Sequence, residues 1–150
     1  MKKILLIALA FVAALVIGSC TKEDASITNT LKYDGKTYKV DFQGYVNQDN
    51  TYDSDIHFLE ESDLEQAWSM MWAVGKVGSF SLPAKEEDFL LTKNTYPNYT
   101  IEFKSGTAKS WVDDNGHLCL VVDGVTNDGK KLKLSVRSMI EQSQRWRLSV

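Results

Sequence analysis

The segment 49–60 concentrates the oxygen-bearing side chains that a calcium ion would require. Its candidate ligands, at positions 1, 3, 5, 7 and 12 of the count used by EF-hand loops, are Asp49, Thr51, Asp53, Asp55 and Glu60. However, Ser54 occupies position 6, where the sharp turn of an EF-hand needs glycine, and a predicted strand precedes the segment instead of a helix. A true EF-hand is therefore excluded. Two interpretations remain, an isolated calcium loop on a β-scaffold and the commoner solvated acidic turn between strands.

A thiol and an imidazole lie two residues apart, at Cys119 and His117. On a strand these side chains face the same side, and a base beside a thiol is the pairing that nucleophilic cysteine chemistry requires. Side chains at i and i+2 of one flat strand point in parallel, however, and no Asn or Asp that could orient the imidazole is evident. We therefore expect a half-buried cysteine beside a surface histidine.

Neighbouring carboxylates could support hydrolysis only if two of them faced each other across a cleft, about 5 to 9 Å apart. The acidic runs are Glu60-Glu61, Glu86-Glu87-Asp88 and Asp113-Asp114. Neighbours in a turn do not meet this condition, so we interpret these runs as solvated loops. No nucleophile elbow, phosphate loop, zinc pattern or dinucleotide fingerprint occurs in the sequence.

Three tryptophans are candidates for ligand contact. Trp68 and Trp72 have the spacing of one helix face and could line an apolar pocket, while Trp111 could stack on a sugar. Aromatic residues of a β-protein are more often part of its core, and this second interpretation stays open for all three.

A basic stripe follows one face of a predicted strand and consists of Lys131, Lys133 and Arg137. These side chains could meet anionic lipid headgroups, an acidic glycan or a protein partner. The alternative, which we favour, is a solvent-exposed strand face whose charges discourage pairing with a strand of another chain at a sheet edge.

The N-terminus has the features of an export signal. Lys2 and Lys3 precede residues 4–17, which carry no polar side chain. This run is shorter than the roughly 20 apolar residues that cross a bilayer, and it is followed by two small residues, as in a secretory signal peptide. The string Ile17-Gly18-Ser19-Cys20 resembles the bacterial lipobox. That resemblance implies cleavage before Cys20 and acyl chains on its thiol, which would anchor the protein to a lipid bilayer.

Residues 21–24, Thr-Lys-Glu-Asp, resemble the signal of one lysine and two acids that directs lipoproteins to the cell surface in Bacteroidota. The alternative is a solvated tether. Through these N-terminal residues the chain resembles small Bacteroidota surface lipoproteins, and the resemblance implies a location at the outer membrane or cell surface. It covers only residues 1–24 and carries no functional residue into the rest of the chain.

The composition is that of an ordinary globular domain, with 43% hydrophobic and 25% charged residues in 150. It excludes a disordered, collagen-like or disulfide-dense chain. Without residues 1–19 the chain keeps 20 acidic and 15 basic residues, too few cations for a nucleic-acid surface. If Cys20 is lipidated, Cys119 has no disulfide partner and the fold depends on packing.

The remaining residues show the period-two alternation and turn residues of antiparallel strands. Strands are predicted over 38–46, 99–104, 107–112, 118–122, 132–140 and 146–150. Turns are predicted at Asp34-Gly35, Ser105-Gly106, residues 113–116 and residues 127–129, the last three joining four strands in a meander. The expected fold is all-β, an antiparallel β-sandwich or barrel of about eight to ten strands.

One helix is predicted over 63–74. Ser62 and Glu65 form a capping box, Leu64, Trp68 and Met71 follow at helical spacing, and Gly75 could end the helix. A buried strand from Trp68 to Val74 is the competing interpretation.

The sequence therefore predicts three parts: a lipoprotein signal peptide (1–19), a tether (20–27) and a single β-domain (28–150). The expected function is a non-enzymatic binding or structural module of the envelope, with a protein or glycan partner. A lipocalin-like carrier of a small apolar ligand is the first alternative, and a small hydrolase that uses an acidic pair is the second. No cofactor is expected beyond the calcium ion considered above.

Overall fold

The structure is a computed structural model that describes residues 27–95 and 99–138. The lipobox, Cys20, all but the last residue of the tether, and the strand predicted over 146–150 lie outside the described residues. No helix within the described ranges is both long enough and apolar enough to span a bilayer.

Nine strands form one antiparallel sheet in the described part of the chain. In chain order they are β1 (Thr30–Tyr33), β2 (Lys36–Val46), β3 (Thr51–Phe58), β4 (Met70–Lys76), β5 (Gly78–Leu82), β6 (Phe89–Lys93), β7 (Phe103–Val112), β8 (Leu118–Thr126) and β9 (Lys131–Arg137). Their order in the sheet is β5-β7-β8-β9-β1-β2-β3-β4-β6. This confirms the predicted all-β class and the range of eight to ten strands.

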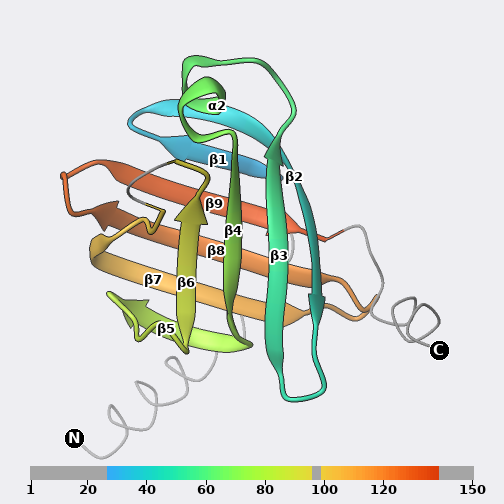
Figure 1. Cartoon of the computed structure of the whole chain (residues 1–150). Helices are drawn as coiled ribbons and strands as arrows, with labels where there is room; N and C mark the ends of the chain where they lie inside the picture. The colour runs from blue at the N-terminus through green and yellow to red at the C-terminus, as the bar shows by residue number, and fades with distance from the viewer. Residues whose placement is uncertain (1–26, 96–98, 139–150) are drawn as a thin grey trace, which may run out of the picture.

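The sheet bends into two layers that are joined through β2, so that it forms a nearly closed barrel (Figure 1). In Figure 1 the strands β3, β4 and β6 cross the layer of β1, β5, β7, β8 and β9 at a steep angle. β2 belongs to both layers, because residues up to Lys39 pair with β1 and residues from Val40 onward pair with β3. A long strand that changes layers is the usual corner of such orthogonal packing.

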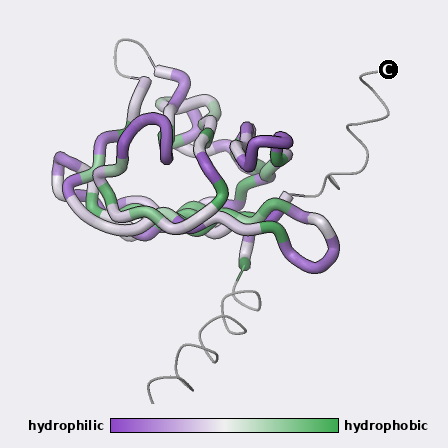
Figure 2. The backbone as a smooth tube through the Cα atoms, turned by 90° about the horizontal axis from the view of Figure 1, so that it is seen from below, coloured by the Kyte–Doolittle hydropathy of each residue, from purple (hydrophilic) through white to green (hydrophobic). Residues whose placement is uncertain are grey.

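Apolar side chains from alternate strand positions fill the space between the layers. Leu31, Phe42, Ile56, Met71 and Leu120 are at most 1% exposed. The tube in Figure 2 changes between hydrophobic and hydrophilic colours within single strands, while the turns are mainly hydrophilic. Each fully buried side chain of this size stabilises the fold by roughly 1.5–3 kcal/mol, so this packing is a major source of the stability of the described domain.

The two layers lie close together at Gly44, in the second half of β2. A Cβ atom there would lie 2.8 Å from Cβ of Ser54 and 3.0 Å from Cδ2 of Leu118. The buried Ser138 hydroxyl donates to the carbonyl of Gly44 at 2.9 Å, and the Ser138 N–H donates to the carbonyl of Leu118 at 2.8 Å. The end of β9 is thereby fixed to β2 and β8 together.

The helix α2 (Asp63–Trp68) is shorter than predicted. The Ser62 hydroxyl accepts a hydrogen bond from the Glu65 N–H at 3.0 Å, which confirms the predicted cap. The helix ends at Trp68 because Ser69, with φ of 59°, turns the chain out of it. Residues 70–76 form β4, so the prediction of helix over 70–74 is wrong and the competing strand is correct there. Pairing with β3 on one side and β6 on the other outweighs the local helical spacing.

The predicted turn at Ser105-Gly106 is also wrong. β7 continues through both residues, with a register shift between Phe103 and Ser105 where it pairs with β8. The meander therefore has three strands, β7, β8 and β9, and only the turns at 113–116 and 127–129 are confirmed. Of the predicted strand 99–104 only its end belongs to β7, and Thr100 instead forms an isolated bridge with Thr92.

Gly106 lies where β7 passes close to the backbone of β8. Its φ is 134°, and a Cβ atom would lie 2.3 Å from the Asp123 carbonyl oxygen and 2.5 Å from Cα of Gly124. Asp34 and Gly35, in contrast, both have positive φ in a two-residue hairpin turn, as predicted.

We predict that Gly106→Ala lowers the free energy of unfolding by about 3 kcal/mol or more, because it adds a clash with backbone to an unfavourable φ. Gly116→Ala is the matched control, since φ is also positive (83°) but nothing lies within 4 Å of the added Cβ. It should cost only about 1 kcal/mol. Urea unfolding of both variants measures the difference, and equal losses would contradict this account of β7.

Candidate functional site

The acidic segment 49–60 does not form a loop that could surround a metal ion. Thr51, Asp53 and Asp55 lie on the outward face of β3, where alternate residues are spaced about 7 Å apart along the strand. Asp49 accepts hydrogen bonds from the N–H and the hydroxyl of Thr51, at 3.1 and 2.6 Å, and Glu60 forms an exposed ion pair with a lysine of β2. Within the described ranges, no three His, Cys, Asp or Glu side chains gather as metal ligands.

The cysteine and the histidine belong to a structural cluster at the start of β8. Asp113 lies beside His117, with 3.4 Å between Oδ2 and Nδ1, so the expectation that no acid orients the imidazole is wrong. Cys119 is fully buried, not half-buried as expected, and its Sγ lies 3.9 Å from the carbonyl oxygen of His117. A thiol without exposed surface is a poor nucleophile for a substrate in solvent.

Asp113 is the centre of that cluster, and its side chain is 7% exposed. One carboxylate oxygen accepts from the N–H groups of Asn115 and His117, both at 2.9 Å, and the other lies 3.3 Å from Nε of Arg137. Burial by itself raises the pKa of Asp113. The N–H groups of His117 and Asn115, with the charge of His117, outweigh that effect, and the net pKa lies below its ordinary value. This carboxylate therefore stays charged and fixes the turn between β7 and β8.

Two of the three candidate tryptophans lie on outer surfaces of the barrel. Trp72 is half-buried on β4, whose inward positions are Met71 and Ala73, so it does not share a face with Trp68. Trp111 is half-buried on β7, and Nζ of Lys109 lies 5.4 Å from the centre of its ring. Only Trp68, at the end of α2, takes part in a pocket at one end of the barrel.

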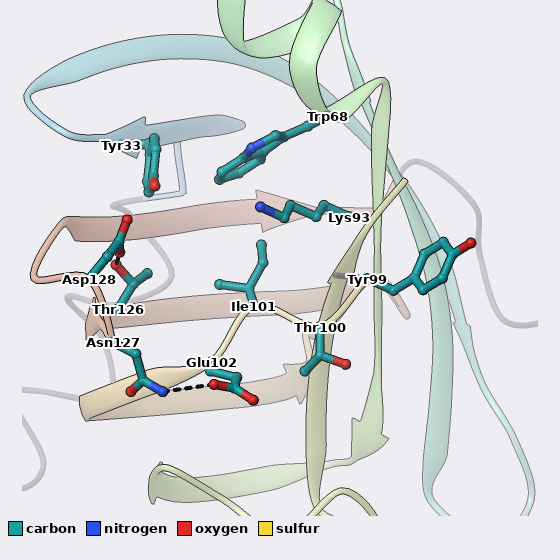
Figure 3. A pocket seen from close by; sticks show the side chains of 10 residues that line it. All are labelled: Tyr33, Trp68, Lys93, Tyr99, Thr100, Ile101, Glu102, Thr126, Asn127 and Asp128. Atoms are coloured by element: carbon teal, nitrogen blue, oxygen red, sulfur yellow. Dashed lines mark hydrogen bonds between the residues drawn. The ribbon is translucent and has the colours of Figure 1, made fainter. Parts of the chain in front are cut away.

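This mouth pocket has a volume of about 490 Å³, within the range of small-molecule sites (Figure 3). It brings together β1, α2, the end of β6, the segment that precedes β7, and the turn between β8 and β9. The residues that line it are Tyr33, Trp68, Lys93, Tyr99, Thr100, Ile101, Glu102, Thr126, Asn127 and Asp128.

The apolar wall of the mouth pocket comes from Tyr33, Trp68 and Ile101. The rings of Tyr33 and Trp68 are 4.7 Å apart between centroids, at an angle of 57°, and Nζ of Lys93 lies 5.2 Å from the Trp68 ring. The N–H of Asn94 donates to the carbonyl of Trp68 at 3.2 Å, which ties the end of α2 to the end of β6. The wall is thus held by backbone contacts between elements that are remote in sequence.

The polar side of the mouth pocket comes from the two loops opposite. The Asn127 side chain donates to the Glu102 carboxylate at 2.8 Å, and the Asn127 N–H donates to the Glu102 carbonyl at 3.0 Å (Figure 3). The Thr126 hydroxyl donates to the Asp128 carboxylate. In Figure 3, Tyr99 points away from the other side chains, and it is 49% exposed.

The charges around the mouth pocket set the protonation of its groups. The hydrogen bond from Thr126 holds the pKa of Asp128 below its ordinary value, and the nearby Lys130 acts in the same direction. Burial raises the pKa of Tyr33 above its ordinary value, and the negative charge of Asp128 raises it further. At neutral pH the pocket therefore presents a phenol that can donate and a carboxylate that can only accept.

A second hollow, of about 440 Å³, adjoins the mouth pocket and shares Thr100, Ile101, Glu102 and Asn127 with it. The two hollows together offer room for a ligand longer than one small ring. Leu82 and Phe89 add apolar surface to the second hollow.

The basic stripe on β9 borders a different depression, which we call the basic groove, on the outer side of β1, β7, β8 and β9. Its volume is about 370 Å³, and its lining includes Lys32, Lys109, Trp111, Asp123 and Lys133. Of the residues predicted for the stripe, only Lys133 lines this groove. Lys131 is exposed on the same face of β9, and Arg137 is engaged by Asp113.

Sequence reasoning located Trp68 but missed every other residue of the mouth pocket. Tyr33, Glu102 and Asn127 come from turns and strand ends that are far apart in the chain, and no spacing links them. The one available signal was the predicted turn at 127–129, whose polar residues line the mouth.

In comparisons with family models, curated proteins and solved structures, nothing matches this chain.

We predict that Asp113→Ala lowers the free energy of unfolding by about 2 kcal/mol at neutral pH, because two N–H groups lose their acceptor and the Arg137 guanidinium loses an ion-pair partner. Since the folded-state pKa is lowered, this stabilisation is present above the unfolded-state value of about 3.9 and is lost as pH falls through the folded-state pKa. The difference from wild type should therefore shrink as the solution is acidified through that range.

Chemical denaturation at a series of pH values measures this dependence. Asp114→Ala, at the exposed neighbouring position, is the control and should change stability by less than about 0.5 kcal/mol. A difference between wild type and Asp113→Ala that stays constant down to low pH would contradict the role given to the carboxylate.

Proposed function

We propose that this protein is a lipid-anchored lipoprotein of the bacterial outer membrane or cell surface, and that it is a non-enzymatic module whose mouth pocket binds a glycan. The lipobox at Ile17-Gly18-Ser19-Cys20 supports the anchor. The pairing of an aromatic wall with a polar wall in one open pocket carries the binding proposal.

A sugar ring has apolar C–H faces and an edge of hydroxyl groups, so it needs an aromatic or aliphatic wall and several hydrogen-bonding groups at once. Tyr33 and Ile101 offer the aromatic and aliphatic wall. The hydrogen-bonding groups come from Glu102, Asn127 and Asp128. The charged Asp128 carboxylate and the protonated Tyr33 phenol supply one acceptor and one donor at neutral pH. The adjoining hollow supports an oligosaccharide over a single sugar.

The lipocalin-like alternative receives less support, because a carrier of an apolar ligand needs space inside the barrel. The interior between the layers holds the side chains of Leu31, Phe42, Ile56, Met71 and Leu120, which are almost without exposed surface. The two hollows at the mouth lie at the end of the barrel and are lined by polar and apolar groups together.

The hydrolase alternative would need a carboxyl group that holds its proton at neutral pH beside one that does not. Asp128 is held in its charged form, and Glu102 is engaged by the Asn127 amide. These contacts suit carboxylates of Asp128 and Glu102 that accept hydrogen bonds from a ligand and position it, and they give less support to the hydrolase alternative.

We predict that Asn127→Ala and Glu102→Ala each weaken glycan binding about tenfold, because each removes a hydrogen bond worth roughly 1.5 kcal/mol. The measurement screens the mature chain with Cys20→Ser against neutral and acidic oligosaccharides, followed by calorimetry on any that bind. Asp114→Ala, which changes an exposed carboxylate outside the pocket, should leave affinity unchanged. Absence of binding to any oligosaccharide, or binding that ignores both pocket variants, would refute the pocket assignment.

For the anchor, we predict that Cys20→Ser abolishes labelling by radioactive fatty acid and releases the protein from the membrane fraction. Cys119→Ser is the matched control, because its thiol is buried in the fold, and it should keep the label. A Cys20→Ser protein that stays labelled would show that the lipoprotein assignment is wrong.

A further inference from the structure

The basic groove gathers positive charge on one side of a chain that is acidic as a whole. Three lysines and one acid, Asp123, line it, whereas residues 20–150 contain 20 acidic and 15 basic residues. Threonine and serine hydroxyls line it too, at Thr30, Thr107 and Ser135. Ammonium and hydroxyl groups together are donors suited to a phosphate or carboxylate ligand.

Two of the lysines stand directly opposite each other, because Lys32 on β1 pairs in register with Lys133 on β9. Like charges at directly opposed positions of an antiparallel pair destabilise a sheet. Neither lysine forms an ion pair with a residue that the structure describes, and Asp123, which is opposite Lys133 on β8, forms none either. The fold therefore keeps a repulsive pair that an external anion would relieve.

Trp111 adds an amphipathic ring to the same groove. Nζ of Lys109 lies 5.4 Å from the ring centre, so the cation and the aromatic face are held together at the rim. A tryptophan next to lysines is well suited to the boundary between water and lipid, where its apolar body and its N–H find different surroundings.

The groove also lies where the chain leaves the fold toward its anchor. Thr28, two residues before β1, is one of the residues that line it. Cys20 is eight residues earlier, a distance that an extended chain spans with about 28 Å at most. An anchor at Cys20 therefore limits Thr28 to about 28 Å from the anchored residue, so the groove can reach the bilayer surface, where anionic headgroups attract lysines.

We propose that the basic groove docks the domain on the anionic phosphate headgroups of the bilayer that holds its lipid anchor. This inference rests on the proposed lipid anchor for its geometry, but the docking itself depends only on residues of the domain. The mouth pocket shares no lining residue with the groove, so the docked domain keeps its mouth available to a ligand.

The test measures binding of the mature chain with Cys20→Ser, which has no acyl anchor, to vesicles by cosedimentation. Vesicles of phosphatidylcholine with phosphatidylglycerol are compared with vesicles of phosphatidylcholine alone. We expect binding to the anionic vesicles only, weakened by added salt, and reduced about fivefold for each lysine of the groove that is neutralised. The triple variant Lys32→Gln, Lys109→Gln and Lys133→Gln should lose about 100-fold.

The matched control removes the same charge elsewhere, at three exposed lysines that do not line the groove: Lys36→Gln, Lys85→Gln and Lys104→Gln. It should bind anionic vesicles nearly as well as the parent chain. Equal losses in the two triple variants would overturn the proposal, because they would show an effect of net charge alone. Lys32→Gln by itself should raise Tm, since it removes the repulsion from Lys133. A variant that binds vesicles poorly but keeps or raises its Tm is therefore folded, and its loss of binding reflects lost docking.

Two further outcomes would also overturn the proposal. Displacement from the vesicles by inorganic phosphate at constant ionic strength would indicate a site for a free anion. Binding to a soluble acidic polysaccharide without binding to anionic vesicles would indicate an acidic glycan as the ligand. Because the assay uses a chain without acyl groups, its result does not depend on whether Cys20 is lipidated, which the fatty-acid labelling tests separately.

Discussion

The close approach of the two layers at Gly44 constrains the rest of this fold. β2 pairs with β1 in one layer and with β3 in the other, and a Cβ atom at position 44 would lie only 2.8 Å from Cβ of Ser54 on β3 and 3.0 Å from Cδ2 of Leu118 on β8. The buried Ser138 hydroxyl then closes the junction by donating to the Gly44 carbonyl. Once the layers are joined in this way, the alternating apolar residues of nine strands face a common interior and are removed from water together.

The mouth pocket is a consequence of this closure. Strand ends and turns at one end of the barrel cannot all pair with each other, and they gather around a space that no single element fills. The pocket is held by short-range contacts such as the hydrogen bond from Asn127 to Glu102, which joins elements that are remote in sequence. An aromatic wall from β1 and α2 therefore faces a polar wall from two loops.

The charged groups have two different roles in the structure. Asp113 is surrounded by N–H groups and by Arg137, so its charge is satisfied internally and stabilises a turn. Lys32 and Lys133 are placed against each other on an open face, so their charge is available to an external partner. The ion-paired Asp113 cluster therefore has a structural role, whereas the face with Lys32 and Lys133 is a candidate docking surface.

The sequence by itself determined the all-β class, the cap of α2 and the hairpin turn at Asp34-Gly35, because alternation and turn chemistry act between neighbouring residues. It could not place residues 70–74, since their helical spacing is real and only pairing with β3 and β6 makes them a strand. Likewise Ser105-Gly106 is typical of a turn, and only pairing with β8 makes both residues part of β7. The mouth pocket and the opposition of Lys32 to Lys133 were decided by tertiary structure alone, because strand register brings together residues that no local pattern connects.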